Sequence, residues 1–269
     1  MINIETIEVS GFEGAIKGMR NPFKNREKSD SAVYDADKDG NPIFTIGSKD
    51  LELCQKLLRA GGDDDAKFMR YIHVQADVNA PLYWWKEFDT YKVATVANSE
   101  STMHTITKRE FTLDDFSYDQ LITFEDDDDD DLMEPAVFYH MINDRIKDKD
   151  IDLPDNQLEL LYPHDILTGT IHMLNEVREA FLDAKKNDEK ALAYRYWYNL
   201  IQLLPSSYMQ KRTVDLNYQT LRRIFFARRH HKLTEWSGEN GFCGWIKSLP
   251  YAEELITYEP CKNKGITKC

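Results

Sequence analysis

The architecture of this chain depends most on the stretch YNLIQLLPSSYMQKRTVDLNYQTLRRIFFARRHHKLTEW, which spans residues 198–236. Between Gln210 and Lys232 this stretch is rich in lysine and arginine and contains a single acidic residue, Asp215. The whole chain, by contrast, has a formal net charge of −13. A local positive field in an acidic protein indicates an anion-binding site.

A helix is predicted over residues 213–232, because steps of three and four residues place related side chains on one face. Starting at Asn217, that face runs through Leu221, Ile224, Arg228, His231 and Glu235. The apolar members should turn the face inward, and a buried arginine needs a partner because an uncompensated charge is costly. Two partners are compatible with the pattern. One is a carboxylate in a structural salt bridge, and the other is an anionic or carbonyl-rich ligand in a cavity that Asn217 and Arg228 share.

The composition is that of an ordinary globular protein, with 42% hydrophobic, 30% charged and 12% aromatic residues among 269. No run approaches the length of a membrane span, and residues 1–12 lack the pattern of an export signal. The acidic balance argues against general nucleic-acid binding, which depends on neutralising phosphates. We therefore expect a cytoplasmic protein with neither a membrane nor a nucleic acid as partner.

Cysteines and acidic clusters give no metal site. The four cysteines are widely spread and form no CxxC pair, so they predict neither a zinc site nor a disulfide framework. Residues 35–40, DADKDG, begin like a calcium-binding loop, but Ile46 stands where a bidentate glutamate is required. The acidic loop at residues 125–131 should be solvated. We predict no bound metal.

The remaining patterns predict both strands and helices. Strands are expected at residues 2–9 and 68–78, and helices after Ser48, after Pro81 and at residues 164–186, 189–203 and 242–249. Residues 1–258 should form a single domain, followed by a loose tail at 259–269.

A polar run at residues 97–102, ANSEST, interrupts the helix that follows Pro81. Its hydroxyl and backbone N–H groups are the kind that bind a phosphate. They are equally typical of a turn in which serine and asparagine side chains form capping bonds.

Taken together, the stretches 81–104 and 198–236 resemble the flavin-dependent thymidylate synthases, from about residue 57 to residue 236. In that family a strand ends in a small residue and proline, and the next helix carries an Arg-His-Arg triplet followed by a serine-containing stretch. The corresponding residues here are Ala80-Pro81, Thr90-Tyr91-Lys92 and Asn98 to His104. Downstream, the spacing of Leu204-Pro205, Asn217 and Arg228 is also that of the family.

The resemblance implies an α+β fold, with a small mixed sheet packed against long helices, and a role for each matching position. Arg228 would contact the pyrimidine of dUMP as the catalytic residue, and Ser101 and Thr102 would hold its phosphate. Glu87 would contact the nucleotide where the family has glutamine. The flavin would be bound by Lys92, Asn217 and Arg223, the last in place of a second asparagine. Met103 replaces an arginine of the family.

The implied reaction is reductive methylation of dUMP, or of a related pyrimidine nucleotide, at C5. FAD and NADPH would be the redox partners, methylenetetrahydrofolate the carbon donor, and the assembly a homotetramer. The chain would then be a divergent phage-like or bacterial member. Two alternatives remain: a non-catalytic nucleotide-binding or interaction homologue that has lost the flavin site, and a structural oligomer without a ligand.

Overall fold

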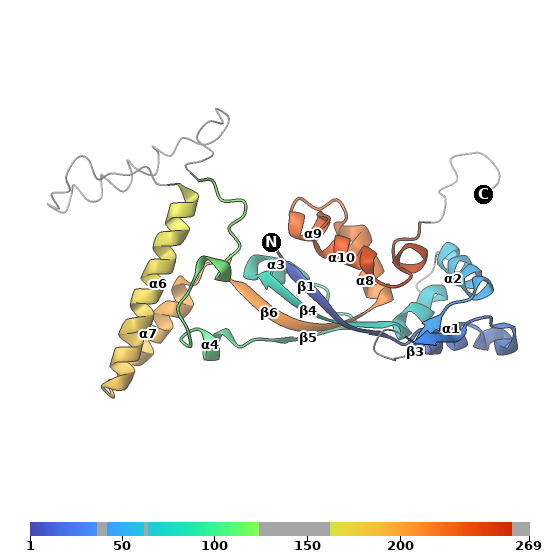
Figure 1. Ribbon diagram of the computed structural model, residues 1–269, viewed down its shortest axis with the longest axis horizontal. Coiled ribbons are helices and arrows are strands. Elements are labelled where there is room, and N and C mark those ends of the chain that lie inside the picture. The colour runs from blue at the N-terminus through green and yellow to red at the C-terminus, as the bar shows by residue number, and fades with distance from the viewer. Residues whose placement is uncertain (37–41, 62–63, 124–161, 260–269) are drawn as a thin grey trace, which may run out of the picture. The chain divides into compact units, whose positions relative to one another are not determined.

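The computed structural model describes residues 1–36, 42–61, 64–123 and 162–259 (Figure 1). The acidic loop at 125–131 and nearly all of the predicted tail lie outside these ranges. The chain divides into two compact units. The first comprises Met1–Glu100 and Gln210–Cys269, and the second comprises Ser101–Met209.

A four-stranded sheet forms the centre of the first unit, in the order β1 (Asn3–Ser10), β4 (His73–Pro81), β6 (Met209–Asn217), β5 (Thr95–Ser99). β1 pairs antiparallel with β4, and β5 pairs antiparallel with β6. Burial alternates along β4, where Val74 and Ala76 are buried while His73 and Gln75 are exposed. The sheet therefore has one apolar face and one polar face.

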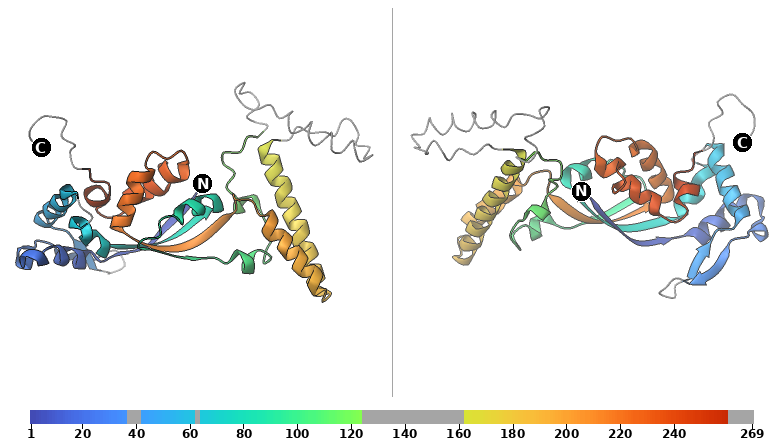
Figure 2. Two further views of the ribbon diagram at one scale, coloured as in Figure 1. Left: turned by 180° about the vertical axis from the view of Figure 1, so that it is seen from behind. Right: turned by 45° about the horizontal axis from the view of Figure 1, so that its top comes forward.

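Helices cover the apolar face, as the two views of Figure 2 show for α8 (Tyr218–Arg228) and α10 (Phe242–Ser248). The other elements of this unit are α1 (Phe12–Met19), α2 (Ser48–Ala60), α3 (Leu82–Phe88), α9 (Thr234–Ser237), the 3-10 turns η1 (Asn21–Phe23), η2 (Arg26–Lys28) and η3 (Asp65–Tyr71), the π-turn η6 (Ala252–Ile256) and the hairpin β2 (Ala32–Ala36) with β3 (Pro42–Thr45). The polar face of the sheet carries ion pairs, including Lys211 Nζ to Asp77 Oδ2 at 2.6 Å.

An aromatic cluster joins the end of α3 to α9 and α10. The Trp84 ring stacks on that of Trp236 at 4.5 Å between centroids and on that of Phe88 at 5.1 Å. Phe242 packs against the same rings, and all four side chains are buried. Because these rings lie in a close-packed core, they fix the ends of α3 and α9 relative to each other.

The second unit contains α4 (Thr102–Thr105), η4 (Leu113–Asp115), α6 (Pro163–Lys186) and α7 (Lys190–Leu203). It has its own core, in which Phe111 and Phe116 pack with Leu174 and Leu200. The helices predicted at 164–186 and 189–203 are confirmed within a residue at either end.

The helix predicted at 213–232 is wrong. Residues 209–217 form strand β6, and the helix α8 occupies only residues 218–228. The reason is a two-residue period that competes with the helical one: Val214 and Leu216 are buried, while Thr213 is exposed between strands. Pairing with two neighbouring strands outweighs the helical pattern there.

Two further expectations are corrected. The strand predicted at 68–78 begins only at His73, because Asp65–Tyr71 is a 3-10 helix. The polar run at 97–102 is mostly strand β5, whose Asn98 and Ser99 pair with Thr213 and Arg212. Strand pairing therefore uses some of the backbone N–H groups of this run.

Candidate functional site

Glu87 and Arg228, which are far apart in the sequence, meet in the first unit. Glu87 lies in the last turn of α3, and Arg228 is the last residue of α8. The Nη1 atom of Arg228 is 2.5 Å from Oε1 of Glu87, and the two side chains are 19% and 27% exposed. This half-buried ion pair is the centre of what we name the Arg228 cluster, defined by Glu87, Tyr91, Arg228, His231 and Trp236.

Three donors surround the carboxylate of Glu87. Besides Arg228, the indole Nε1 of Trp236 donates to Oε2 at 2.8 Å, and His231 Nε2 lies 3.2 Å from Oε1. The backbone N–H of Leu233 donates to Nδ1 of His231 at 3.1 Å. Because Nδ1 accepts that bond, a neutral His231 carries its proton on Nε2 and donates it to Glu87.

Tyr91 completes the cluster from the loop after α3. Arg228 Nε donates to the Tyr91 hydroxyl at 2.6 Å, and the guanidinium carbon lies 5.5 Å from the Tyr91 ring centroid and 5.2 Å from that of Trp236. The arginine is thus held between two aromatic rings, which restricts its orientation. Of the two partners that the sequence left open for Arg228, the structure shows a carboxylate.

Asn217 lies at the other end of α8. It is the N-cap residue, its side chain accepts a hydrogen bond from the Thr220 N–H at 2.9 Å, and it is 4% exposed. Arg228 is the last residue of the same helix, so the two side chains lie at opposite ends of α8. The eleven residues of α8 separate the two side chains by about 16 Å along the axis.

Lys92 and Arg223 are exposed, and neither forms an ion pair with another residue of the described ranges. Lys92 follows Tyr91 in the loop between α3 and β5, and Arg223 lies on α8. Both cations are therefore accessible to an anion.

Ser101 and Thr102 belong to the second unit, at the start of α4. Ser101 is exposed, and its carbonyl oxygen accepts a hydrogen bond from the Thr105 hydroxyl at 2.9 Å. Ser101 is the N-cap residue of α4, but its side chain forms no capping hydrogen bond, so the capping interpretation is not confirmed there and the phosphate role stays a prediction.

His231 and Trp236 are members of the cluster that we did not predict as site residues. They lie three and eight positions after Arg228, where the chain turns back from α8 into α9. The helical steps that lead to Arg228 continue to His231, but no spacing in the sequence connects His231 or Trp236 to Glu87.

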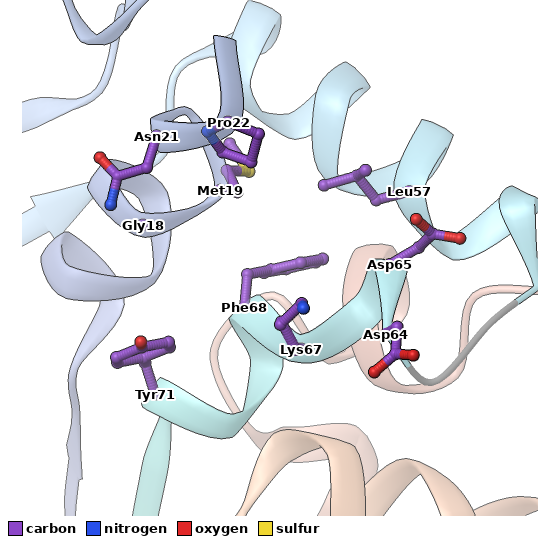
Figure 3. A pocket seen from close by; sticks show the side chains of 10 residues that line it. All are labelled: Gly18, Met19, Asn21, Pro22, Leu57, Asp64, Asp65, Lys67, Phe68 and Tyr71. Atoms are coloured by element: carbon purple, nitrogen blue, oxygen red, sulfur yellow. The ribbon is translucent and has the colours of Figure 1, made fainter. Parts of the chain in front are cut away.

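A separate pocket of about 570 Å³ lies between α1, α2 and η3 (Figure 3). Phe68 reaches across it towards Leu57, and Asp64, Asp65 and Lys67 stand at its edge. It shares no residue with the Arg228 cluster and contains none of the predicted site residues.

No group of three or more His, Cys, Asp or Glu side chains in the described ranges could hold a metal ion. No helix within them is long and apolar enough to cross a membrane.

Solved structures with a similar fold are known. The chain is similar to flavin-dependent thymidylate synthase ThyX from Helicobacter pylori, solved with FAD and dUMP, at a TM-score of 0.53 and 14% identity over 94% of this chain and 97% of that one. Its fold is that of ThyX. A second structure of the same enzyme gives a TM-score of 0.54 at 15% identity, over 95% of this chain and 97% of that one.

A UMP/dUMP methylase, PolB from Streptomyces cacaoi, matches with a TM-score of 0.42 and 13% identity over 84% of this chain and 75% of that one. No protein-family model matches the sequence, and no curated protein matches it. The α+β fold expected from the resemblance to the ThyX enzymes is confirmed at the level of the fold.

Proposed function

We propose that the protein binds a pyrimidine nucleotide at the Arg228 cluster. The observation that carries this proposal is the direct contact between Glu87 and Arg228. The resemblance to the ThyX enzymes assigns both positions to the nucleotide, and the H. pylori structures of similar fold contain dUMP. Both side chains are partly exposed, so a ligand can reach them.

The reaction we propose is reductive methylation of dUMP, or a related pyrimidine nucleotide, at C5. Bound FAD, reduced by NADPH, would supply the hydride, and methylenetetrahydrofolate would supply the carbon. The residues of this chain would bind the nucleotide and polarise its pyrimidine ring. The guanidinium of Arg228, held by Tyr91 and Glu87, stabilises negative charge on a pyrimidine carbonyl oxygen. The resemblance assigns the nucleotide phosphate to Ser101 and Thr102.

The residues that would hold FAD fit its phosphates better than its ring. Lys92 and Arg223 are exposed cations without an ion-pair partner in the described chain, so each can bind a phosphate oxygen. Asn217 is buried, and its carbonyl oxygen is engaged by the helix cap. Only its amide N–H groups remain to contact a flavin.

A second candidate is a homologue that binds the nucleotide without catalysis. It is favoured by Tyr91, which stands within the family's basic triplet and forms a hydrogen bond to Arg228 instead of contributing a charge. The helix cap at Asn217 supports the same interpretation.

Flavin binding separates the two candidates. The purified protein is incubated with FAD, separated from unbound FAD by gel filtration, and inspected for absorbance near about 450 nm that bleaches with NADPH. A flavin signal with turnover of dUMP supports the enzyme. A colourless protein whose melting temperature rises with a pyrimidine nucleotide supports the binding homologue. A protein that responds to neither FAD nor any pyrimidine nucleotide contradicts both.

We further propose a cytoplasmic homo-oligomer, with a tetramer as the expected state. Exposed apolar side chains on α7, such as Tyr194 at 62% and Leu203 at 46%, favour self-association. Light scattering coupled to size-exclusion chromatography measures the mass directly, and a monomer at micromolar concentration would contradict the proposal.

A further inference from the structure

The Arg228 cluster presents an asymmetric set of hydrogen-bonding groups. Arg228 uses one N–H on Tyr91 and one on Glu87, and its remaining N–H groups take no partner among the described residues. A guanidinium offers about five donors, so several are available to a ligand.

The carboxylate of Glu87 has little capacity left. Oε1 accepts from Arg228 and His231, while Oε2 accepts only from Trp236. A carboxylate oxygen accepts about two hydrogen bonds, so Oε2 can take roughly one more. The cluster therefore offers one acceptor beside two or more donors. Beside Oε2 of Glu87, on the side away from Arg228, the cluster offers no further donor. The N–H groups of Trp236 and His231 there already donate to Glu87.

Pyrimidine bases differ in the edge that would meet this set. Cytosine presents an amine at C4 and then two acceptors, N3 and O2. Uracil presents a carbonyl at C4, an N3–H donor and a second carbonyl, so it requires donors on both sides of an acceptor. Cytosine can thus form three hydrogen bonds with Glu87 and Arg228. Uracil can form only two, because one of its carbonyl oxygens either faces the Glu87 carboxylate or has no partner.

We propose that Glu87 makes this site selective for a pyrimidine nucleotide with a 4-amino group, a cytidine monophosphate, over a uridine monophosphate. The proposal rests on the proposed binding of pyrimidine nucleotides at Arg228. Glu87 is the specificity-determining residue: its Oε2 accepts from the exocyclic amine, and Arg228 donates to N3 and O2. A glutamine at position 87 would instead offer both a donor and an acceptor, which matches the C4 carbonyl and N3–H of uracil.

The test is isothermal titration of the full chain with dCMP and with dUMP, for the wild-type protein and for Glu87→Gln. The wild-type protein should bind dCMP about tenfold more tightly than dUMP, and Glu87→Gln should lower or reverse that ratio by about tenfold. Glu253→Gln is the matched control, because Glu253 is exposed on η6 outside the cluster. It should leave the ratio unchanged.

The outcomes are distinct. A wild-type protein that prefers dUMP, or a ratio that Glu87→Gln does not move, overturns the selectivity and leaves nucleotide binding standing. A protein that binds neither nucleotide overturns both. The wild-type comparison stands by itself if the variant fails to fold, which its far-UV circular dichroism reports.

Discussion

Arg228 has a structural role in the fold, and the proposed function gives it a second role in binding. Its charge is balanced by Glu87 and its position is fixed by Tyr91 and Trp236, so the folded protein tolerates it on a half-buried surface. The N–H groups that remain are held in a defined direction. A ligand that binds them encounters a donor array that is already ordered, which lowers the entropic cost of binding.

We expect Arg228→Lys to weaken nucleotide binding by about tenfold or more, because lysine keeps the charge but loses the fork that contacts two partners at once. The free energy of unfolding should also fall by about 1–2 kcal/mol. Titration calorimetry and urea unfolding measure the two effects. Arg229→Lys is the control, since Arg229 pairs at the surface with Glu259 and should change either quantity little. Equal effects of the two variants would contradict a special role for Arg228.

At the scale of elements, the sequence predicted what local patterns determine. Helices α6 and α7 were found because their apolar periodicity and end signals lie within the segment itself. Strand β6 was missed because its pairing with β4 and β5 is not encoded locally. The positions of Glu87 and Arg228 were identified only through the resemblance, and their contact with His231 and Trp236 depends on how α3 packs beside α9. No local sequence pattern predicts that packing.

The N-cap of α8 gives a prediction for this element. Asn217→Ala should lower the free energy of unfolding by about 1 kcal/mol, because the Thr220 N–H loses its acceptor. Asn217→Asp should retain stability, since aspartate also caps and suits the positive end of the helix dipole. Urea unfolding compares the two variants. If Asn217→Asp is as stable as wild type yet loses FAD affinity, the residue serves the flavin as well as the helix.

The start of α1 gives a second prediction. Gly11 has a φ of 89°, and a Cβ atom there would lie 1.8 Å from the Tyr71 carbonyl oxygen. Gly11→Ala should therefore destabilise the protein by more than about 2 kcal/mol. Gly14, one turn later, has open space around it, so Gly14→Ala should stabilise the helix by about 0.5–1 kcal/mol. Thermal unfolding of both variants checks the expected opposite signs.

At the scale of the whole molecule, a buried ion pair ties the end of α1 to α2 and contributes to the response to acid. Arg20 Nε lies 2.5 Å from Asp50 Oδ1, and both side chains are almost fully buried. Burial raises the pKa of the Asp50 carboxyl, but hydrogen bonds from Ser29 and Ser31 and the charge of Arg20 outweigh it, so this pKa lies below its usual value. A lowered pKa in the folded state stabilises the protein above the unfolded value of about 3.9.

We expect the urea midpoint to fall as the pH drops from about 5 through the folded pKa of Asp50, because protonation then removes this contribution. Asp50→Asn should cost about 3 kcal/mol at neutral pH, since it leaves Arg20 buried without a counter-charge, and should flatten the acid dependence. Glu13→Gln, in an exposed pair with Lys17, should cost less than about 0.5 kcal/mol. An unchanged acid dependence in Asp50→Asn would show that other carboxylates dominate it.

The chain leaves the first unit at Glu100 and re-enters it at Gln210, and these two points are neighbours. Ser99 pairs with Arg212, the Glu100 N–H donates to the Lys211 carbonyl at 3.0 Å, and Gln210 Nε2 donates to the Glu100 carbonyl at 3.1 Å. The entire second unit is thus an insertion at the tip of a β5–β6 hairpin. Its length can change between relatives without disturbing strand register, because lengthening a loop between fixed ends costs little entropy. The register of the sheet and the contacts of the Arg228 cluster therefore do not depend on the length of this insertion.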